Sequence, residues 1–128
     1  MGLIYRKDAP LTGRQLAALC SQCGCHMTEE DFTEALYRAY FTISCWDGTR
    51  LVGFIQTVSN GITEAWLEDI LVHPDWGGYG IGKNLVTRAI AELHAEGICS
   101  VSLHLPKALQ DFYESLGYEI HATGPDRK

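Results

Sequence analysis

The sequence predicts an α/β fold in which helices cover both faces of a mixed central sheet. Segments of strand length, rich in β-branched and aromatic residues, recur along the chain. Segments with apolar residues at helical spacing separate some of them. The strand–helix–strand unit at residues 64–105 requires a parallel, right-handed crossover. The predicted order is β-α-α-β-β-β-α-β-α-β, in a single domain over residues 1–128.

Helix-capping patterns define the N-terminal part of the chain. After a first strand at residues 2–6, Thr12 and Gln15 form a capping-box pattern, so a helix is expected to run to about residue 20 or 22. Thr28 has Asp31 three residues later, which predicts the start of a second helix. The buried stripe of this second helix is predicted to comprise Phe32, Leu36, Ala39 and Tyr40.

The remaining elements follow from turn signals and alternation. Asp47-Gly48 and Asn60-Gly61 are typical hairpin turns, so three antiparallel strands are expected around them. These strands are predicted at residues 40–46, 51–58 and 64–72. Beyond a central helix that ends near Gly97, we expect a strand at 99–105, a helix at 106–115 and a last strand at 118–122.

A glycine-dense loop between a buried strand and the central helix organises the chain. Residues 70–72 suit a buried strand, and Pro74 cannot continue its hydrogen-bonded ladder. Four glycines follow between residues 77 and 82, and glycine suits backbone that bends sharply or contacts a ligand. Because the first amides of a helix lack intrahelical acceptors, this loop favours a phosphate ligand.

Two general phosphate-binding patterns fit the loop incompletely. A P-loop matches from Gly77 to Lys83 but fails at Asn84, which lacks the hydroxyl that holds Mg²⁺. A dinucleotide-binding fingerprint begins at Gly78 but has Lys83 where its third glycine is required. The structural alternative is a tight turn that only packs the helix on the strand.

The segment from His73 to Gly82 resembles the acyl-CoA pyrophosphate loop of the GNAT superfamily of N-acetyltransferases. That pattern is (Gln/Arg)-x-x-Gly-x-(Gly/Ala): Gly80 and Gly82 match its glycines, while Gly77 stands where Gln or Arg is usual. The segment 108–118, which contains Phe-Tyr-x-x-x-Gly-Tyr, is similar to the family's second hallmark. The two hallmarks lie in the family's element order and together imply one N-acetyltransferase domain over the whole chain.

The resemblance implies that acetyl-CoA binds as co-substrate, without a metal, in a gap between the strands at 64–72 and 99–105. Its pantetheine amides would pair with the backbone of Ile70, Leu71 and Val72 like an added strand. Its pyrophosphate would accept hydrogen bonds from loop amides, reinforced by the helix dipole. The loop residues so assigned are Gly77, Gly78, Tyr79, Gly80, Ile81, Gly82 and Lys83.

The implied reaction is direct attack of a neutral primary amine on the thioester. Glu68 is assigned as the base, directly or through a water, and Asp69 is the alternative because a bulge would exchange the faces of this strand. Tyr113 matches the family tyrosine that lies near the sulfur, which makes it the candidate acid; structural roles stay open for all three residues. Simple alternation places Trp66, Glu68 and Ile70 on one face and Leu67, Asp69 and Leu71 on the other.

Composition limits the partners. A formal net charge of −6 argues against nucleic-acid binding, and no apolar run reaches membrane-spanning length. The acceptor is expected to be a small-molecule or peptide amine. The rival function is a non-catalytic, regulatory acyl-CoA-binding module of the same fold. Because members of the resembled family often pair, a homodimer is one expected assembly.

The cysteines and the N-terminus predict a cytoplasmic protein. The first residues lack the apolar region of a signal peptide, and five cysteines, an odd number, favour a reducing compartment over a disulfide framework. The cluster Cys20, Cys23, Cys25 and His26 is dense enough for zinc, but no second pair of ligands completes a finger, so no metal site is expected. Cys20 and Cys23, at helical spacing, are expected to pack.

Overall fold

The computed structural model describes residues 2–103, 111, 114 and 120–122. Within these residues, six strands form one sheet in the order β1-β2-β3-β4-β5-β6. The elements are β1 (Leu3–Lys7), α1 (Gly13–Gln22), α2 (Glu29–Arg38), β2 (Phe41–Asp47), β3 (Arg50–Ser59), β4 (Glu64–Val72), the 3-10 helix η1 (Pro74–Trp76), α3 (Ile81–Ala95), β5 (Ser100–Leu103) and β6 (Ile120–Ala122). This order confirms the predicted fold class.

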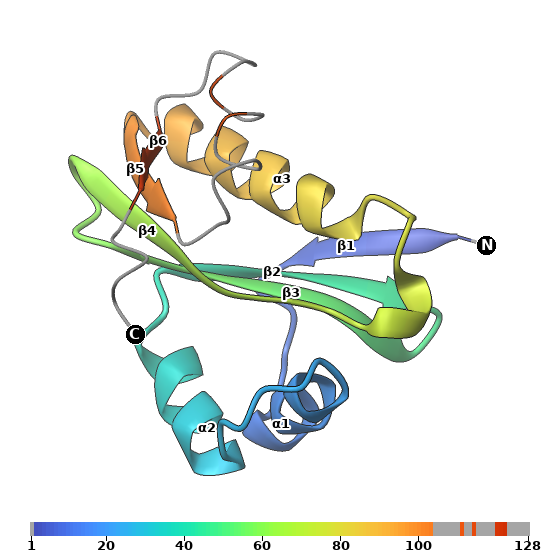
Figure 1. Ribbon diagram of the computed structural model, residues 1–128. Coiled ribbons are helices and arrows are strands. Elements are labelled where there is room, and N and C mark those ends of the chain that lie inside the picture. The colour runs from blue at the N-terminus through green and yellow to red at the C-terminus, as the bar shows by residue number, and fades with distance from the viewer. Residues whose placement is uncertain (1, 104–110, 112–113, 115–119, 123–128) are drawn as a thin grey trace.

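Helices lie on both faces of the sheet, as Figure 1 shows: α3 covers one face, and α1 with α2 covers the other. The core under α3 joins helix residues such as Leu85 and Leu93 to sheet residues such as Ile55 and Leu67. The core under α1 and α2 is centred on Phe32 of α2 and Phe54 of β3. Because each face has its own apolar cluster, the direction of a β4 side chain decides which helical layer it meets.

The predicted helix starts are confirmed. Thr12 and Gln15 form both hydrogen bonds of the capping box, and the Thr28 side chain accepts the Asp31 N–H at the start of α2. The predicted stripe of α2 is wrong at its end, because the extended backbone of Ala39 terminates the helix at Arg38. Tyr40 instead donates its N–H to the Thr57 carbonyl, and its side chain is 37% exposed.

Parallel pairing extends further than predicted. The β4–β5 pair is parallel, as expected for the unit at 64–105, but β5 and β6 are parallel as well. Of the helix predicted at 106–115, the structure describes Asp111 and Glu114, and both are helical.

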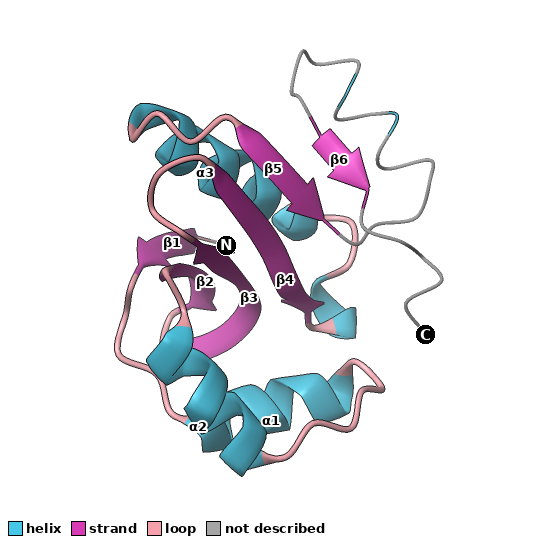
Figure 2. Ribbon diagram, turned by 90° about the vertical axis from the view of Figure 1, so that its left-hand side faces the viewer, coloured by secondary structure: helices cyan, strands magenta, loops and turns pink. Residues whose placement is uncertain are grey.

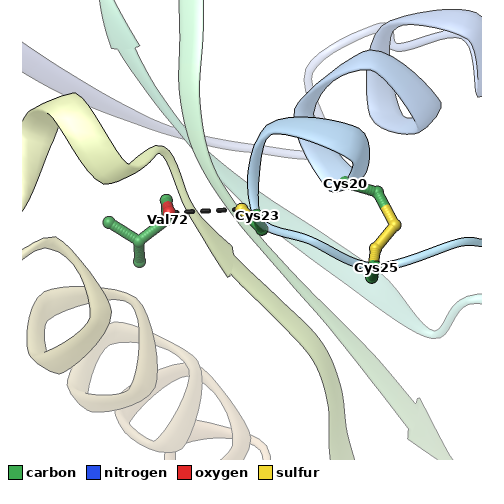
Figure 3. Close-up of a disulfide and its surroundings, with 4 residues drawn as sticks. All are labelled: Cys20, Cys23, Cys25 and Val72. Carbon is green, nitrogen blue, oxygen red and sulfur yellow. Dashed lines mark hydrogen bonds between the residues drawn. A yellow bond between two sulfur atoms is a disulfide. The ribbon is translucent and has the colours of Figure 1, made fainter.

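The expectation of unpaired cysteines is wrong for Cys20 and Cys25, which form a disulfide with their Cα atoms 5.2 Å apart. Gly24 has a φ of +84°, and this left-handed turn folds the chain back so that the Cys25 N–H donates to the Cys20 carbonyl. Cys23 stays a thiol and donates to the Val72 carbonyl oxygen at 3.2 Å (Figure 3). The end of α1 is thereby tied to the end of β4.

Close approach of α1 to α2 makes Gly13 sensitive to substitution. A Cβ at Gly13 would lie 2.2 Å from the Glu29 carbonyl oxygen and 2.9 Å from the Thr33 amide nitrogen. Since backbone atoms cannot turn aside as a side chain can, Gly13→Ala is expected to lower the free energy of unfolding by about 2–3 kcal/mol in urea denaturation. Gly82→Ala, in the first turn of α3 with its nearest contact at 3.6 Å, is the matched control and should cost nothing comparable.

Candidate acetyl-CoA and acceptor site

A bulge interrupts β4 in its middle. Gln56 of β3 pairs with Glu68, and Phe54 pairs with Leu71, so two β4 residues, Asp69 and Ile70, lie opposite one β3 residue. Asp69 has a φ of +54°, in the left-handed region that few residues other than glycine, asparagine and aspartate adopt. An extra residue with this conformation bends a strand and changes the direction of the side chains that follow it.

The bulge overturns the simple alternation predicted for this strand. Ala65 and Leu67 pack in the core under α3, and beyond the bulge Ile70 and Val72 join the same core. Leu71 instead packs in the core under α1 and α2. The prediction that Ile70 shares a face with Glu68 is therefore wrong, and the exchange of faces is the one that a bulge produces.

The edge of β4 is open beyond the bulge in the described part of the chain. Pairing between β4 and β5 runs from Glu64–Ser100 to Leu67–Leu103 and goes no further. Figure 2 shows β5 ending beside the middle of β4, whose C-terminal half continues past it. Backbone groups of residues 68–72 on this edge can thus pair with an extended ligand in the manner of an added strand.

The loop after β4 presents a run of backbone donors. The Trp76 and Gly77 amides donate to His73 and Pro74 carbonyls, whereas the amides of residues 78–82 have no backbone acceptor in the described residues. Gly80, with a φ of +73°, is the N-cap of α3, and no side chain caps this helix. The N-terminus of α3 therefore offers consecutive N–H groups and the positive end of its dipole to an anion.

The structure places the predicted cofactor residues in two groups. Ile70, Leu71 and Val72 form the end of β4, although the Val72 carbonyl already accepts the Cys23 thiol. Gly77 is unsuited to the predicted contact through its amide, because that N–H is used within the loop. The remaining predicted residues lie together at the start of α3, and they are Gly78, Tyr79, Gly80, Ile81, Gly82 and Lys83.

The carboxylates of Glu68 and Asp69, the two candidate bases, belong to adjacent residues at the bulge. Both side chains are half-buried. Burial, and then the nearby Glu68 charge, raises the pKa of the Asp69 carboxyl above its ordinary value. A raised pKa brings a carboxylate closer to the acid–base range in which proton transfer is efficient at neutral pH. The raised pKa therefore applies to Asp69, and Glu68 lies beside it in the same strand.

Gln56 is a polar residue of this region that the sequence reasoning missed. It is 5% exposed, donates from Nε2 to the Ala35 carbonyl at 3.4 Å, and lies opposite Glu68 in the β3–β4 register. Its Oε1 is the buried side-chain oxygen without a hydrogen-bond partner in the described structure. A buried acceptor without a partner costs free energy, so a ligand N–H placed here would be favoured. The signal available in the sequence was a lone amide inside the apolar run 51–58.

The raised pKa of Asp69 leads to a stability prediction. At neutral pH the folded state holds a carboxylate that it disfavours, so Asp69→Asn should raise the free energy of unfolding. This gain should shrink as the pH falls through the raised folded-state pKa and vanish below the unfolded value of about 3.9. Asn also adopts the left-handed conformation readily, and that contribution stays constant with pH. Urea denaturation across pH 3–8 separates the electrostatic contribution from the conformational one. If the difference in the free energy of unfolding between Asp69→Asn and the wild type did not change with pH, the electrostatic contribution would be refuted.

Other predicted features lie outside this site or outside the described residues. Tyr113 lies outside the described residues, so the structure does not test its predicted role. Among residues 2–103, 111, 114 and 120–122, no group of three His, Cys, Asp or Glu side chains is arranged to hold a metal ion. In the same residues, no helix has both the length and the apolar character needed to cross a membrane.

Comparison with known proteins identifies the family. The model of the acetyltransferase (GNAT) domain matches residues 38–120. An uncharacterized N-acetyltransferase, ycf52, from the alga Gracilaria tenuistipitata var. liui is 34% identical over 76 residues, which are 59% of this chain and 40% of that protein. The chain thus matches less than half the length of this curated relative.

Solved structures share the fold. A probable acetyltransferase from meticillin-resistant Staphylococcus aureus has a TM-score of 0.77 at 24% identity, over 99% of this chain and 96% of that one. PaiA N-acetyltransferase from Thermoplasma acidophilum, solved with coenzyme A, has a TM-score of 0.69 at 17% identity, over 98% and 94%. Because the family model matches more than half of this chain, the chain belongs to the GNAT acetyltransferase family.

Proposed function

We propose that this chain transfers an acetyl group from acetyl-CoA to a primary amine by direct attack in a ternary complex. The observation that carries the proposal is the run of amides at Gly78–Gly82, without backbone acceptors in the described chain, beside the open edge of β4. A diphosphate fits the first feature and an extended, amide-bearing arm fits the second. Coenzyme A contains both parts, joined end to end.

The acceptor amine is proposed to approach β4 from the face covered by α1 and α2. Glu68 lies opposite Gln56, whose Nε2 contacts α2, so both belong to this face. The Gln56 Oε1 and the Glu68 carboxylate are hydrogen-bond acceptors, and an amine nitrogen supplies the matching donors. This pairing favours an amine over an alcohol bearing a single O–H. The size of the amine, whether metabolite or peptide, is left to experiment.

In the proposed reaction, side chains of this chain accept and donate the protons that move. The amine nitrogen forms a bond to the thioester carbon and loses a proton to Glu68, or to Asp69 in its place. A main-chain N–H of β4 beyond the bulge donates to the carbonyl oxygen as negative charge develops there. The carbon–sulfur bond breaks, and the departing thiolate takes a proton from the Tyr113 hydroxyl. Holding the two substrates in line supplies much of the rate.

A substitution at Tyr113 tests the proposed acid. Tyr113→Phe removes only the hydroxyl, so kcat should fall about 10²-fold while the Kd for acetyl-CoA stays within about twofold. Steady-state kinetics with calorimetric measurement of cofactor binding distinguishes the two effects. Equal losses in kcat and in binding would assign Tyr113 to packing and reject it as the acid.

The rival function, a non-catalytic acyl-CoA-binding module, predicts binding without turnover. The deciding experiment mixes the protein with acetyl-CoA and a panel of primary amines that includes polyamines, aminoglycosides and peptides with free N-termini. Thiol release that depends on the amine, with a product heavier by one acetyl group, supports the transferase. Tight acetyl-CoA binding with no product across the panel would favour the regulatory module.

Assembly and location belong to the same proposal. We propose a protein that forms a homodimer and lies in the cytoplasm, where the Cys20–Cys25 disulfide would have to persist in a reducing compartment. Sedimentation at micromolar concentration tests the dimer, and fractionation of the source cells tests the location. A monomer at all concentrations, or recovery outside the cytoplasm, would overturn the respective statement.

A further inference from the structure

A cavity of about 360 Å³ lies between α1 and the β2–β3 hairpin, with His73, the residue after β4, in its wall. Its polar lining consists of Gln15 and Gln22 from α1, Thr49 and Arg50 from the hairpin, and His73, the N-cap of η1. No Asp or Glu is among the described residues that line it. Its volume lies in the range of cavities that bind small molecules.

Arg50 and His73 both contact the Trp76 ring. The Arg50 guanidinium lies over the Trp76 ring, 4.8 Å from its centroid, and the His73 ring meets Trp76 edge-on at 5.1 Å. The His73 side chain is almost fully buried, with the residue 4% exposed, and its backbone N–H donates to the Val52 carbonyl. Within the described residues, Arg50 forms no ion pair with a carboxylate.

The hydrogen bond at Nδ1 assigns the proton of a neutral His73 ring to Nε2. Its Nδ1 accepts the Asp75 N–H at 3.1 Å, so Nδ1 carries no proton and Nε2 does. The atom facing Nε2, at 3.3 Å, is Nη2 of Arg50, and a guanidinium has donors only. Two N–H donors therefore face each other at the wall of the cavity. A buried donor without an acceptor is unfavourable, and an oxygen that accepts from both would remove the conflict.

We propose that this cavity is a second binding site, which takes a small molecule or ion through an anionic oxygen group, phosphate or carboxylate. One such oxygen accepts from His73 Nε2 and from the Arg50 guanidinium. Gln15 provides a further donor, because its Oε1 is occupied by the capping box and its amide nitrogen is the remaining polar end. Binding at this site does not require acetyl transfer to take place. Its anion is either a phosphate group of coenzyme A reaching around Trp76 or a separate ligand.

The test is a titration of the full chain with inorganic phosphate, at constant ionic strength against chloride. Thermal stability and ¹H–¹⁵N spectra of the His73 imidazole and the Arg50 side chain are followed together. Arg50→Gln removes the cation at an exposed hairpin position, and phosphate affinity should fall about tenfold or more, since hydrogen bonds to charged groups are strong. The matched control, Arg14→Gln, removes an exposed cation of α1 that does not line the cavity and should leave the affinity within about twofold.

A second arm identifies the source of the anion. If phosphate still stabilises the protein when coenzyme A is saturating, the ligand is separate from the cofactor. If coenzyme A abolishes the phosphate effect and Arg50→Gln weakens both ligands, the cofactor's own phosphate occupies the site. Equal phosphate affinity in wild type and Arg50→Gln, or equal loss in both variants, would overturn the proposal. Because the readout is phosphate binding, failure of the proposed acetyl transfer leaves the result interpretable.

Discussion

Glu68→Gln is expected to lower kcat for amine acetylation about 100-fold, while the Kd for acetyl-CoA stays within about twofold. The amide keeps the shape of the side chain but cannot accept the proton that the attacking amine must lose. Glu68 is half-buried and lies opposite the unpartnered oxygen of Gln56, so it is placed where an amine would be held. Initial rates at saturating acetyl-CoA, with cofactor affinity measured separately, give both quantities.

Two further variants complete the Glu68 experiment. Glu64→Gln makes the same change at an exposed position of the same strand, four residues away, and should leave kcat unaltered. Asp69→Asn tests the neighbouring carboxylate, whose raised pKa also suits a base. If Asp69→Asn lowers kcat and Glu68→Gln does not, the base is Asp69. If neither variant lowers kcat, the base is not at the bulge of β4.

Gly80→Ala is expected to weaken acetyl-CoA binding about tenfold. Gly80 has a φ of +73° at the N-cap of α3, and an alanine holds that conformation at a cost of about 1–2 kcal/mol. In the free protein the loop relieves this strain by turning its amides away, so binding must restore the conformation. At about 1.4 kcal/mol for each factor of ten, the strain converts into the predicted loss of affinity.

The matched control for Gly80 lies at the other end of the same helix. Gly97 has a φ of +84°, and a Cβ at this position would meet no atom within 4 Å, so Gly97→Ala introduces comparable strain. Gly97→Ala should unfold at a lower urea concentration than the wild type, whereas Gly80→Ala, whose loop relieves the strain in the free protein, should unfold close to the wild type. Calorimetric titration should show weaker coenzyme A binding for Gly80→Ala alone. Equal affinity for the two variants would mean that the loop amides do not bind the cofactor.

The sequence predicted the elements that local chemistry determines. Capping at Thr12 and Thr28 and the glycine loop at the start of α3 are set by residues within a few positions of each other, and the structure contains them. The bulge was considered only as an alternative, because the adjacent polar residues Glu68 and Asp69 interrupt the alternation without showing which of them leaves the ladder. Its effect on Ile70 and Leu71 therefore could not be placed from the pattern alone.

Contacts set by the path of the folded backbone were the second source of error. The Cys20–Cys25 disulfide depends on the left-handed turn at Gly24, just beyond the helix end that the sequence predicts near residue 20 or 22. The meeting of Arg50 and His73 joins positions 23 residues apart and depends on the β3–β4 register. Neither follows from spacing along the chain, since both are fixed by how the backbone returns on itself.

The central claim is that the amides of Gly78–Gly82 and the open edge of β4 together hold acetyl-CoA. A crystal structure with coenzyme A tests it most directly. We predict diphosphate oxygens within hydrogen-bonding distance of at least three of these amides, and the pantetheine arm paired with backbone of residues 68–72. A diphosphate bound elsewhere, or a β4 edge covered by the chain's own backbone in that crystal, would contradict the account.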